Sequence, residues 1–491
     1  MLSLRTKRRR ALRPQLESLE GRVVLSAVFD SVIGVGNETS AITPSGNAMD
    51  AAGNSYVTGT LMGVMDLDPA VDRPDHSDIL TPRGKTDAFV AKYAPDNSLV
   101  WARRMGGDNT NNDFTTDSGS GVAVDSTGNV FVTGRFNGQS DFGPFSLTSA
   151  GDSDGFVTKL DPNGSVLWAK RWGGTTRDDG ADIAVDAAGN VVTVGSTLLV
   201  NSAGGQSYTG FEVRKFSPTG AAVWNKRIDN SGGTAVSVAT DAAGNVFLGG
   251  QFYGTTDFNP DSTKTNYVTG ANKMAVNGGA NSYVLKLTAS GSFSWVAPFI
   301  AKTAEATNSW VFFEDLAVDA GGNVFVGGFQ TGQVDINPSS SGDYRLSNSR
   351  KYNGFVAKLS SGGSLSWASQ TGGDMNQRLA VDPSGAVYVT GTFGSGPEAF
   401  TPGSGLPAAT TRGGTDVFVT KFTPTGAQDW AVTFGGTGFE NTRSIAVNAS
   451  GMIYVVGMYP ATVDFDPDPL TTYELNNQLF NNMFLLKLRK S

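Results

Sequence analysis

The sequence contains no cysteine and a single histidine, His76, among its 491 residues. Without cysteine the chain forms neither disulfides nor a thiolate nucleophile, and its redox compartment stays open. A single histidine excludes zinc and copper sites that need several histidines from one chain, and a Ser-His-Asp triad would have to use His76. Because His76 lies in the polar, proline-containing stretch VDRPDHSD, we expect a solvent-exposed loop residue.

Long apolar runs and an excess of basic residues are also missing. No run of eighteen apolar residues occurs, so the sequence predicts no membrane-spanning helix. The formal net charge is −8, and because residues 1–26 carry a net charge of +5, the remaining residues carry −13. This acidic body argues against a nucleic-acid partner and is compatible with cation binding.

Glycine and aromatic residues are abundant, with 63 glycines and eight tryptophans, a composition typical of a folded, turn-rich all-β chain. A ten-residue segment, which reads DSTGNVFVTG from Asp125, recurs in seven copies about 66 residues apart. Every copy has glycine at its fourth and tenth positions. The copies begin at Asp50, Asp125, Asp186, Asp241, Asp319, Asp382 and Asn448.

A second repeated segment alternates with the first and reads DGFVTKLDPNGSVLWAKRWGG from Asp154. All seven copies keep a lysine: Lys92, Lys159, Lys215, Lys286, Lys358, Lys421 and Lys487. In the first six copies a tryptophan follows the lysine by nine residues: Trp101, Trp168, Trp224, Trp295, Trp367 and Trp430.

Each unit therefore contains four short runs of β-branched and aromatic residues, typified by GVAVD, VFVTG, GFVTKL and VLWAKRW. Asp-x-x-Gly-Asn and Pro-x-Gly-Ser segments join the runs in pairs, because Asn and Gly tolerate the positive φ of tight hairpin turns. The pattern predicts an all-β, seven-bladed β-propeller with four antiparallel strands per blade. The alternatives are an open solenoid, whose repeats are usually shorter and capped, and two stacked sandwiches, which would not keep one register throughout.

The last copy of the second segment ends soon after Lys487, before any tryptophan. A matching strand lies near the start, in SAVFDSVIGVG. There, Phe29 is as far from the next hairpin as the tryptophans are, and Gly34 follows it by five residues. We therefore expect residues 27–36, with Phe29 in the tryptophan position, to complete the blade formed by residues 437–491 and to close the ring.

The units resemble the bacterial seven-bladed propeller (SBBP) repeat over roughly residues 27–491, most clearly in DSTGNVFVTGRF and DGFVTKLDPNGSVLWAKRWGG. The fourth unit departs from the pattern, because Ile300 and Ala301 replace its final Gly-Gly pair. The resemblance implies a propeller in a protein that is exported or surface-associated, a group in which most members have no assigned activity.

Residues 8–26, RRRALRPQLESLEGRVVLS, resemble an N-terminal sorting segment of large exported proteins from planctomycete-type bacteria. The segment lacks the apolar core of about 7–15 residues found in ordinary secretory signals. A disordered basic tail and a short amphipathic helix are the alternatives. We expect residues 1–26 to be an export segment, disordered or removed, and the protein to lie outside the cell or at its surface.

A carboxylate-rich turn follows the Val-Thr-Gly strand in five of the seven units. Oxygen ligands at or near alternate positions can converge on a hard cation, so calcium is the cofactor that the sequence suggests. Plain turn chemistry is the alternative, because Asp or Asn before Pro ends a strand. The candidate calcium ligands are Asp464, Asp466 and Asp468; Asp66, Asp68 and Asp72; and Asp257, Asn259 and Asp261.

The recurring lysines and tryptophans have a structural interpretation. We expect each lysine to run along its sheet and meet a turn carboxylate or carbonyl, the alternative being an anion site around a central channel. The tryptophans are expected in the blade cores, since they recur in register. Trp172 and Trp310 fall outside that register and are better candidates for an exposed, ligand-stacking surface, although we expect a structural role for them too.

These features favour a non-enzymatic binding or scaffold module, exported and monomeric, with a protein or glycan partner held by its variable loops. The longest inserts, about residues 60–86 and 251–281, are the expected docking sites. The alternative is a carbohydrate-active hydrolase or lyase with paired carboxylates on one face of the propeller. Its candidate carboxylates depart from the repeat: Glu212, Glu314, Glu398 and Glu440.

Overall fold

The computed structural model describes residues 27–490, apart from residues 38, 69–70, 72, 109–116, 201–205, 230–232, 262, 270–279, 302–308, 333, 340–343, 347–351, 395–408, 469–470 and 477–481. The described residues form strands and turns, and none lies in a helix. Within this part of the chain there is accordingly no helix that is long and apolar enough to cross a membrane.

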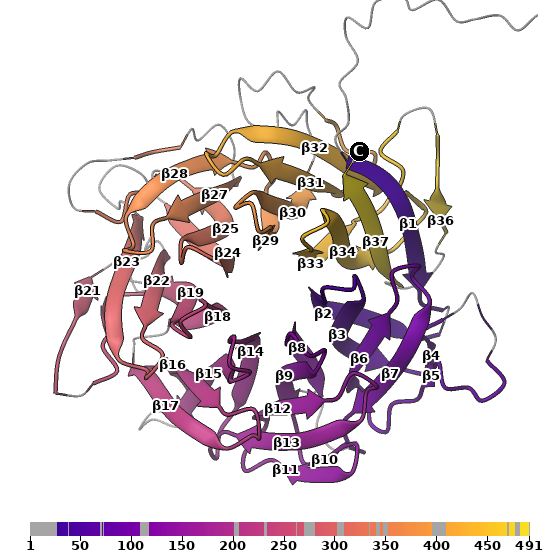
Figure 1. Ribbon diagram of the computed structural model, residues 1–491, viewed down its shortest axis with the longest axis horizontal. Helices are drawn as coiled ribbons and strands as arrows, with labels where there is room; N and C mark the ends of the chain where they lie inside the picture. Colours follow the sequence, from indigo (N-terminus) through magenta and orange to yellow (C-terminus); the bar gives the residue numbers. More distant parts are fainter. Residues whose placement is uncertain are drawn as a thin grey trace, which may run out of the picture.

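Seven antiparallel sheets surround a central axis (Figure 1); each contains four strands of the repeat, and two of them also include short strands from the inserts. The innermost strands are β2 (Ala41–Met49), β8 (Ser118–Val124), β14 (Asp178–Val185), β18 (Thr234–Thr240), β24 (Trp310–Val318), β29 (Met375–Val381) and β33 (Asn441–Val447). The second strands are β3 (Ser55–Met62), β9 (Val130–Phe136), β15 (Val191–Val200), β19 (Val246–Phe252), β25 (Val324–Thr331), β30 (Val387–Phe393) and β34 (Met452–Tyr459).

Two further rings of strands complete the blades. The third strands are β6 (Asp87–Tyr93), β12 (Asp154–Leu160), β16 (Gln206–Phe216), β22 (Asn281–Leu287), β27 (Asn353–Leu359), β31 (Asp416–Phe422) and β37 (Asn482–Lys490). The outermost strands are β7 (Leu99–Met105), β13 (Val166–Trp172), β17 (Ala222–Asp229), β23 (Phe293–Ala301), β28 (Leu365–Gln370), β32 (Gln428–Gly436) and β1 (Ala27–Val35). Blade 1 contains β2, blade 2 contains β8, and so on to blade 7, which contains β33.

The two faces of the ring carry different connections. The hairpin face carries the tight turns that join the first strand to the second and the third strand to the fourth. The loop face carries the second-to-third connections and the links between blades, and all the long inserts lie there. Short strands pair within these inserts: β4 (Met65–Asp66) with β5 (Ile79–Leu80), β10 (Gln139–Phe142) with β11 (Phe145–Thr148), β20 (Thr255–Asp257) with β21 (Tyr267–Thr269), and β35 (Val463–Asp464) with β36 (Glu474–Leu475); β26 (Val334–Asp335) pairs with β23.

The Asp-x-x-Gly-Asn segments form the predicted turns of the hairpin face. In blade 2, Asp125 Oδ1 accepts hydrogen bonds from the backbone N–H groups of Thr127 and Asn129, both at 2.9 Å. Gly128 has a φ of 82°, in the left-handed region that favours glycine. One Asp side chain, or Asn448 in blade 7, and one glycine thus fix the geometry of each of these hairpins.

Tryptophans on the outermost strands fix each blade to the next. Trp101 Nε1 of blade 1 donates to the carbonyl of Pro162 in blade 2, 3.0 Å away. The indole ring covers Gly164, where an added Cβ atom would lie 2.7 Å from the ring, so the turn needs glycine for room as well as for its φ of 81°. The same hydrogen bond joins Trp168 to Pro218, Trp224 to Ala289, Trp295 to Ser361 and Trp367 to Pro424.

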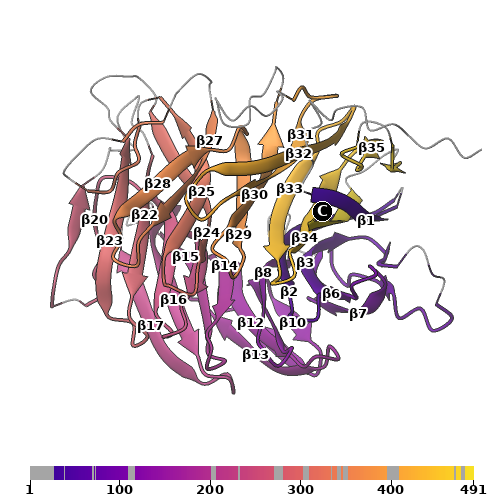
Figure 2. The same cartoon turned by 45° about the horizontal axis from the view of Figure 1, so that its top comes forward.

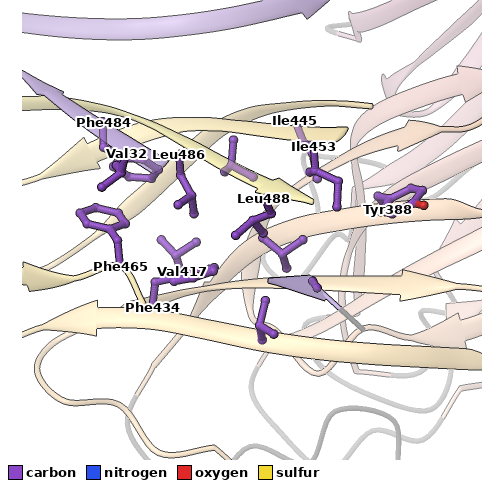
Figure 3. Close-up of a cluster of buried hydrophobic side chains, with 14 of the residues drawn as sticks. Val32, Tyr388, Val417, Phe434, Ile445, Ile453, Phe465, Phe484, Leu486 and Leu488 are labelled. Carbon is purple, nitrogen blue, oxygen red and sulfur yellow. The ribbon is translucent and has the colours of Figure 1, made fainter. Parts of the chain in front are cut away.

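The N-terminal strand closes the ring, as predicted. β1 pairs antiparallel with β37 along its length and forms the outermost strand of blade 7 (Figure 1), and the C-terminal end of the chain is marked beside β1 in Figure 2. Val32 of β1 is buried in an apolar cluster between blades 6 and 7, beside Phe484 and Leu486 of β37 (Figure 3). Blade 7 therefore takes three strands from the C-terminal end of the chain and one from near the N-terminus.

The register of β1 differs from the prediction by two residues. In the six other blades the tryptophan is the partner of the repeated lysine. In blade 7, however, Lys487 pairs with Ser31. The assignment of Phe29 to the tryptophan position is therefore wrong, and Ser31 occupies that position. The glycine that follows it by five residues is Gly36, not Gly34.

In blade 7, polar contacts take the place of the tryptophan indole. Asn97, in the turn of blade 1, donates from Nδ2 to Ser31 Oγ at 2.9 Å. Asp30 Oδ2 lies 2.8 Å from Lys487 Nζ, so an ion pair crosses between the two ends of the chain. The pairing of β1 with β37 is therefore supported by apolar packing and by this ion pair.

Removal of residues 1–36 is expected to destabilise the whole ring, because it exposes both an apolar layer and the unpaired edge of β37. The melting temperature should fall and the protein should associate through blade 7, as measured by thermal denaturation and light scattering at several protein concentrations. Removal of residues 1–26 alone is the control and should leave both measurements unchanged. A monomer with unchanged melting after the longer deletion would contradict the closure.

Candidate functional site

A β-bulge in the innermost strand of every blade shapes the central channel. The register between first and second strands shifts once in each of the seven blades. A bulge leaves one residue unpaired and redirects its side chain. The residues at these shifts line a cavity of about 350 Å³ on the axis of the ring.

Charged residues enter this cavity from blades 3, 5, 6 and 7. They are Asp182, Glu314, Asp315, Arg378 and Arg443. Blades 1 and 2 contribute small or uncharged residues at the same level, including Ser45, Gly46, Asn47, Ser120 and Gly121. At this level of the channel the repeat units therefore differ from one another: four blades contribute charged side chains, and blades 1 and 2 contribute none.

Asp182 and Asp315 share one hydroxyl group. Ser237 Oγ lies 3.0 Å from Asp182 Oδ2 and 3.0 Å from Asp315 Oδ1. A serine hydroxyl has one hydrogen to donate, so one of the two contacts requires a protonated carboxyl group. Burial, reinforced by the charge of Asp315, raises the pKa of Asp182 to about 7. The serine hydroxyl thus links the carboxyl groups of blades 3 and 5 through blade 4.

Backbone N–H groups also donate to the carboxylate oxygens of the channel. Asp182 accepts from Ile183 and Val238, and Asp315 accepts from Leu316 and Leu379. Glu314 accepts from two N–H groups of blade 6, at 3.2 and 2.7 Å. Four of these six donors belong to the next blade, and the other two belong to the next residue of the same strand. The carboxylates therefore join the blades around the axis.

The two arginines of the channel differ in their surroundings. Arg378 donates from Nη1 to the carbonyl of Glu314 at 3.2 Å and from Nε to the carbonyl of Arg443 at 3.1 Å. Burial raises the pKa of Glu314 and of Asp315, and the positive charge of Arg378 opposes both shifts. Burial, followed by the like charge of Arg378, lowers the pKa of Arg443. Arg378 therefore has acidic neighbours, whereas its own charge acts against Arg443.

The glutamates that depart from the repeat lie at separate places. Glu314 lies in the channel, and Glu212 forms an ion pair with Arg214 inside β16. Glu440 is buried at the boundary of blades 6 and 7, where its carboxyl group faces Asp416. Glu398 lies outside the described residues. The three described glutamates do not come together as a catalytic pair.

Buried carboxyl pairs recur between blades. Burial, with a contribution from the charge of Asp416, raises the pKa of Glu440 to about 7, and backbone N–H of Gly436 donates to its carboxyl group at 3.2 Å. Asp117 faces Asp87 in the same way at the boundary of blades 1 and 2, and burial raises its pKa to about 6. The Gly-Gly segments that end the outer strands thus supply N–H donors to acids of the next blade.

The carboxylate-rich turns are built from consecutive side chain–backbone hydrogen bonds. Asp464 Oδ1 accepts from the N–H of Asp466, whose Oδ1 accepts from Asp468, at 3.1 and 3.0 Å. The same chain of contacts runs through Asp257, Asn259 and Asp261. This is the turn chemistry considered as the alternative to metal binding.

In the first insert, Asp68 accepts from Arg73 in an ion pair of 3.0 Å, Asp66 accepts the N–H of Asp68, and Asp72 lies outside the described residues. His76 is exposed there, as expected. No group of three metal-ligating acidic or histidine side chains is found in the part of the chain that the structure describes. Calcium binding stays a prediction.

Six of the seven recurring lysines meet a carboxylate or carbonyl of a turn, as expected, and Lys421 instead pairs with Asp429 of the outermost strand β32. Lys215 Nζ is 2.9 Å from Asp186 of its own hairpin turn. Trp172, predicted as a candidate for an exposed surface, is instead buried, with Arg214 over its ring. Trp310 is exposed and lies at the loop-face end of blade 5, next to Phe312. Of the two tryptophans outside the register, Trp310 alone remains a candidate for stacking on a ligand.

The charged residues of the channel, apart from Glu314, were not singled out from the sequence. A signal for them exists, because they occupy the fourth and fifth positions before the hairpin Asp or Asn. The fourth position is Gly46, Gly121, Asp182, Ser237, Asp315, Arg378 or Ser444, and the fifth includes Glu314 and Arg443. A comparison of the seven units for positions at which only some of them carry a charged residue would have found the fourth and the fifth positions.

Comparison with known proteins supports the fold. Residues 100–143 match the family model of the SBBP beta-propeller repeat. The chain is 23% identical over 480 residues to an uncharacterized WD repeat-containing protein, L264, of Acanthamoeba polyphaga mimivirus, a match that covers 80% of this chain and 33% of that protein. It is 25% identical over 440 residues to the regulatory protein FlaEY of Caulobacter vibrioides, covering 83% of this chain and 42% of that one. The chain thus spans less than half the length of these relatives.

Solved structures of similar shape include proteins with and without enzymatic activity in their descriptions. A polysaccharide lyase, the PL25 ulvan lyase, matches with a TM-score of 0.45 and 10% identity, over 94% of this chain and 96% of that one. The Dos1 propeller matches with a TM-score of 0.41 and 7% identity, over 94% and 95%.

Glu440 releases its proton at a higher pH in the folded protein than in the unfolded chain. Its contribution to the free energy of unfolding is therefore fully present below the pKa of the unfolded chain and is lost as the pH rises through about 7, the pKa in the folded protein. Asp117 and Asp182 act in the same direction. The free energy of unfolding is therefore expected to fall between about pH 5 and pH 8. Chemical denaturation across this range measures the slope.

The Glu440→Gln variant should flatten that slope, because its amide can donate to Asp416 without titrating. At about pH 8 it should be more stable than the original protein by on the order of 1–3 kcal/mol. Glu474→Gln, at an exposed position, is the matched control and should leave the slope unchanged. An unchanged slope in Glu440→Gln would show that titration of Glu440 does not contribute to the pH dependence of stability.

Proposed function

We propose that the protein is a non-enzymatic binding module, whose ring of blades is a rigid scaffold and whose loop face binds a protein or glycan partner. The observation that carries the proposal is the distribution of exposed apolar side chains. Eleven of the fifteen exposed large apolar residues in the described part of the chain lie on the loop face: Met62, Val64, Val71, Ile79, Phe145, Tyr267, Trp310, Tyr344, Met375, Phe439 and Tyr473. The other four, Val28, Val100, Leu167 and Val223, lie on outermost strands.

The first insert, residues 60–86, is the densest part of this surface. Met62, Val64 and Val71 are each 50% exposed, and Ile79 is 37% exposed. Scattered apolar side chains are ordinary on a protein surface, but several within one short insert are typical of a binding site. The second long insert, residues 251–281, adds Tyr267, which is 65% exposed. Both inserts were the expected docking sites.

The channel carboxylates support binding over hydrolysis. A glycosidase needs one carboxyl group free to donate a proton and a second free to act as base or nucleophile. Here the oxygens of Asp182, Glu314 and Asp315 accept hydrogen bonds from backbone N–H groups and from Ser237. Their role in joining blades accounts for their burial without a reaction.

The docking surface can be tested with two matched triple variants. Met62→Ser, Val64→Ser and Ile79→Ser together remove apolar area from the first insert, and Val100→Ser, Leu167→Ser and Val223→Ser together remove it from the outer rim. Purified glycans and cell-surface proteins are screened with the original protein, and every ligand found is titrated against both variants.

We expect the insert variant to weaken binding by about tenfold or more, because each lost apolar contact contributes on the order of 1 kcal/mol. The rim variant should bind as the original protein does. Equal binding by the insert variant and loss of binding in the rim variant would place the partner elsewhere and overturn the proposed surface.

Residues 1–26 lie outside the described residues, and we propose that they direct export to the cell surface or beyond. Their net charge of +5 on an otherwise acidic chain supports this. The full chain and a chain that starts at residue 27 are to be expressed in a planctomycete-type host. The full chain should be degraded by protease added to intact cells or appear in the medium, and the shortened chain should stay protected inside. Equal protection of both would contradict export by this segment.

A further inference from the structure

Methionine is the only source of sulfur in the chain, because the sequence contains ten methionines and no cysteine. Met1 and Met274 lie outside the described residues, and only two of the other eight are exposed. Met62 is 50% exposed and Met375 is 38% exposed, and both lie on the loop face. The remaining six are buried or half-buried: Met49, Met65, Met105, Met452, Met458 and Met483. Since no thiol competes for an oxidant, access to the methionine sulfur decides which residue is oxidised first.

A tight turn in the first insert separates an exposed methionine from a buried one. Gly63, directly after Met62, has a φ of 85°, and an added Cβ atom would lie 2.3 Å from Ser40 Oγ, so the turn requires glycine. Asn37 Nδ2 donates to the carbonyl of Val64 at 2.9 Å. Met65 then pairs with Leu80 and is buried in the apolar cluster between blades 7 and 1. Two methionines that are three residues apart in the sequence therefore differ completely in exposure.

The fold does not require an apolar side chain at the position of Met62. Met62 is the last residue of β3 and lies opposite Ala41 of β2. The same position, twelve residues after the hairpin Asp or Asn, holds Asn137 in blade 2 and Thr331 in blade 5. A polar group at this place is therefore compatible with the blade, and the apolar character of Met62 concerns the surface.

We propose that Met62 is a site of reversible oxidation, at which a peroxide converts part of the loop-face docking surface from apolar to polar. A lone pair on the Met62 sulfur attacks one oxygen of hydrogen peroxide, and the S–O bond forms as the O–O bond breaks. The released hydroxide takes up the proton of the transferred oxygen, so the products are methionine sulfoxide and water. The sulfur is oxidised by two electrons and the peroxide is reduced. Methionine sulfoxide reductases return the sulfoxide to the thioether.

Oxidation at Met62 changes the densest apolar part of the loop face. The sulfur belongs to the same insert as Val64 and Ile79, whose side chains are also exposed. A sulfoxide is polar and chiral, so it disrupts an apolar contact that the thioether makes. The effect on docking rests on the proposed function, whereas the modification itself does not depend on it.

The modification is tested on the purified full chain with dilute hydrogen peroxide. Mass spectrometry of proteolytic peptides follows the gain of one oxygen atom at each methionine over time. Met62 should be oxidised about tenfold or more faster than Met65, because only Met62 is exposed to the solvent. The two residues lie in one short segment, so Met65 is a matched internal control.

The change in the surface is measured by elution from a phenyl matrix, which retains proteins by their exposed apolar area. In the Met375→Leu variant, Met62 is the only exposed methionine among the described residues. This variant should elute earlier after peroxide treatment and return to its first position after treatment with methionine sulfoxide reductases. Met62→Gln in the same variant should elute early without peroxide. The double variant Met62→Leu, Met375→Leu should elute at the same position before and after peroxide.

Three results would overturn the proposal. The first is oxidation of Met62 and Met65 at equal rates, and the second is unchanged elution of oxidised Met375→Leu. The third is a fall in the melting temperature of oxidised Met375→Leu that the double variant does not show, because oxidation would then act on the fold. Ligands that bind equally to the original protein and to the insert variant would overturn the docking surface alone and leave the oxidation of Met62 in place.

Discussion

The contact on which the ring depends is an indole of one blade lying on the glycine turn of the next. Trp101 covers Gly164 and donates to the carbonyl of Pro162, and four other blade boundaries repeat the arrangement. It couples the outermost strand of one sheet to the hairpin face of its neighbour. Since a blade buries both of its faces only between neighbours, this contact fixes the rotation at which apolar layers meet. The repeated lysines act at the same boundaries, since Lys92 and Lys159 also donate to Pro162 and Pro218 of the next blade.

The channel follows from the same constraint. Apolar packing between blades leaves the innermost strands with one side on the axis, and the bulges turn a few residues into that space. There the repeat no longer imposes a residue type. Asp182, Asp315 and Ser237 use the freedom to join three blades through one shared hydroxyl group. Arg443 is placed by the same device, and its Nε has no hydrogen-bond partner among the described residues.

Much of the fold could be predicted because two segments recur with each residue class in the same structural role. The number of blades, the strand order, the hairpin turns and the closure by residues near the N-terminus all follow from that recurrence. The register of β1 was predicted wrongly because two glycines, Gly34 and Gly36, lie close together, and counting back five residues from the wrong one moves the assignment from Ser31 to Phe29. The error placed Gly34 where Gly36 lies.

The candidate site was less predictable for a related reason. Residues of the channel sit at or beside bulges, where the alternation of buried and exposed positions is interrupted, so patterning does not show which side chains face the axis. Glu314 stood out because its charge departs from the repeat, but the proximity of Asp182 and Asp315 depends on how far the ring curves between blades 3 and 5. Only the closed ring brings them to one serine.

The pairing of the chain ends has a mechanical consequence. Ala27 lies opposite Lys490, so the first residue of β1 and the last of β37 leave the propeller at one point of its rim. A force that pulls these ends apart loads the hydrogen-bonded pairs of the two strands one after another, starting with that pair. Tension between the ends therefore peels β1 from blade 7 as a zipper opens, at a far lower force than sliding the strands past each other would need.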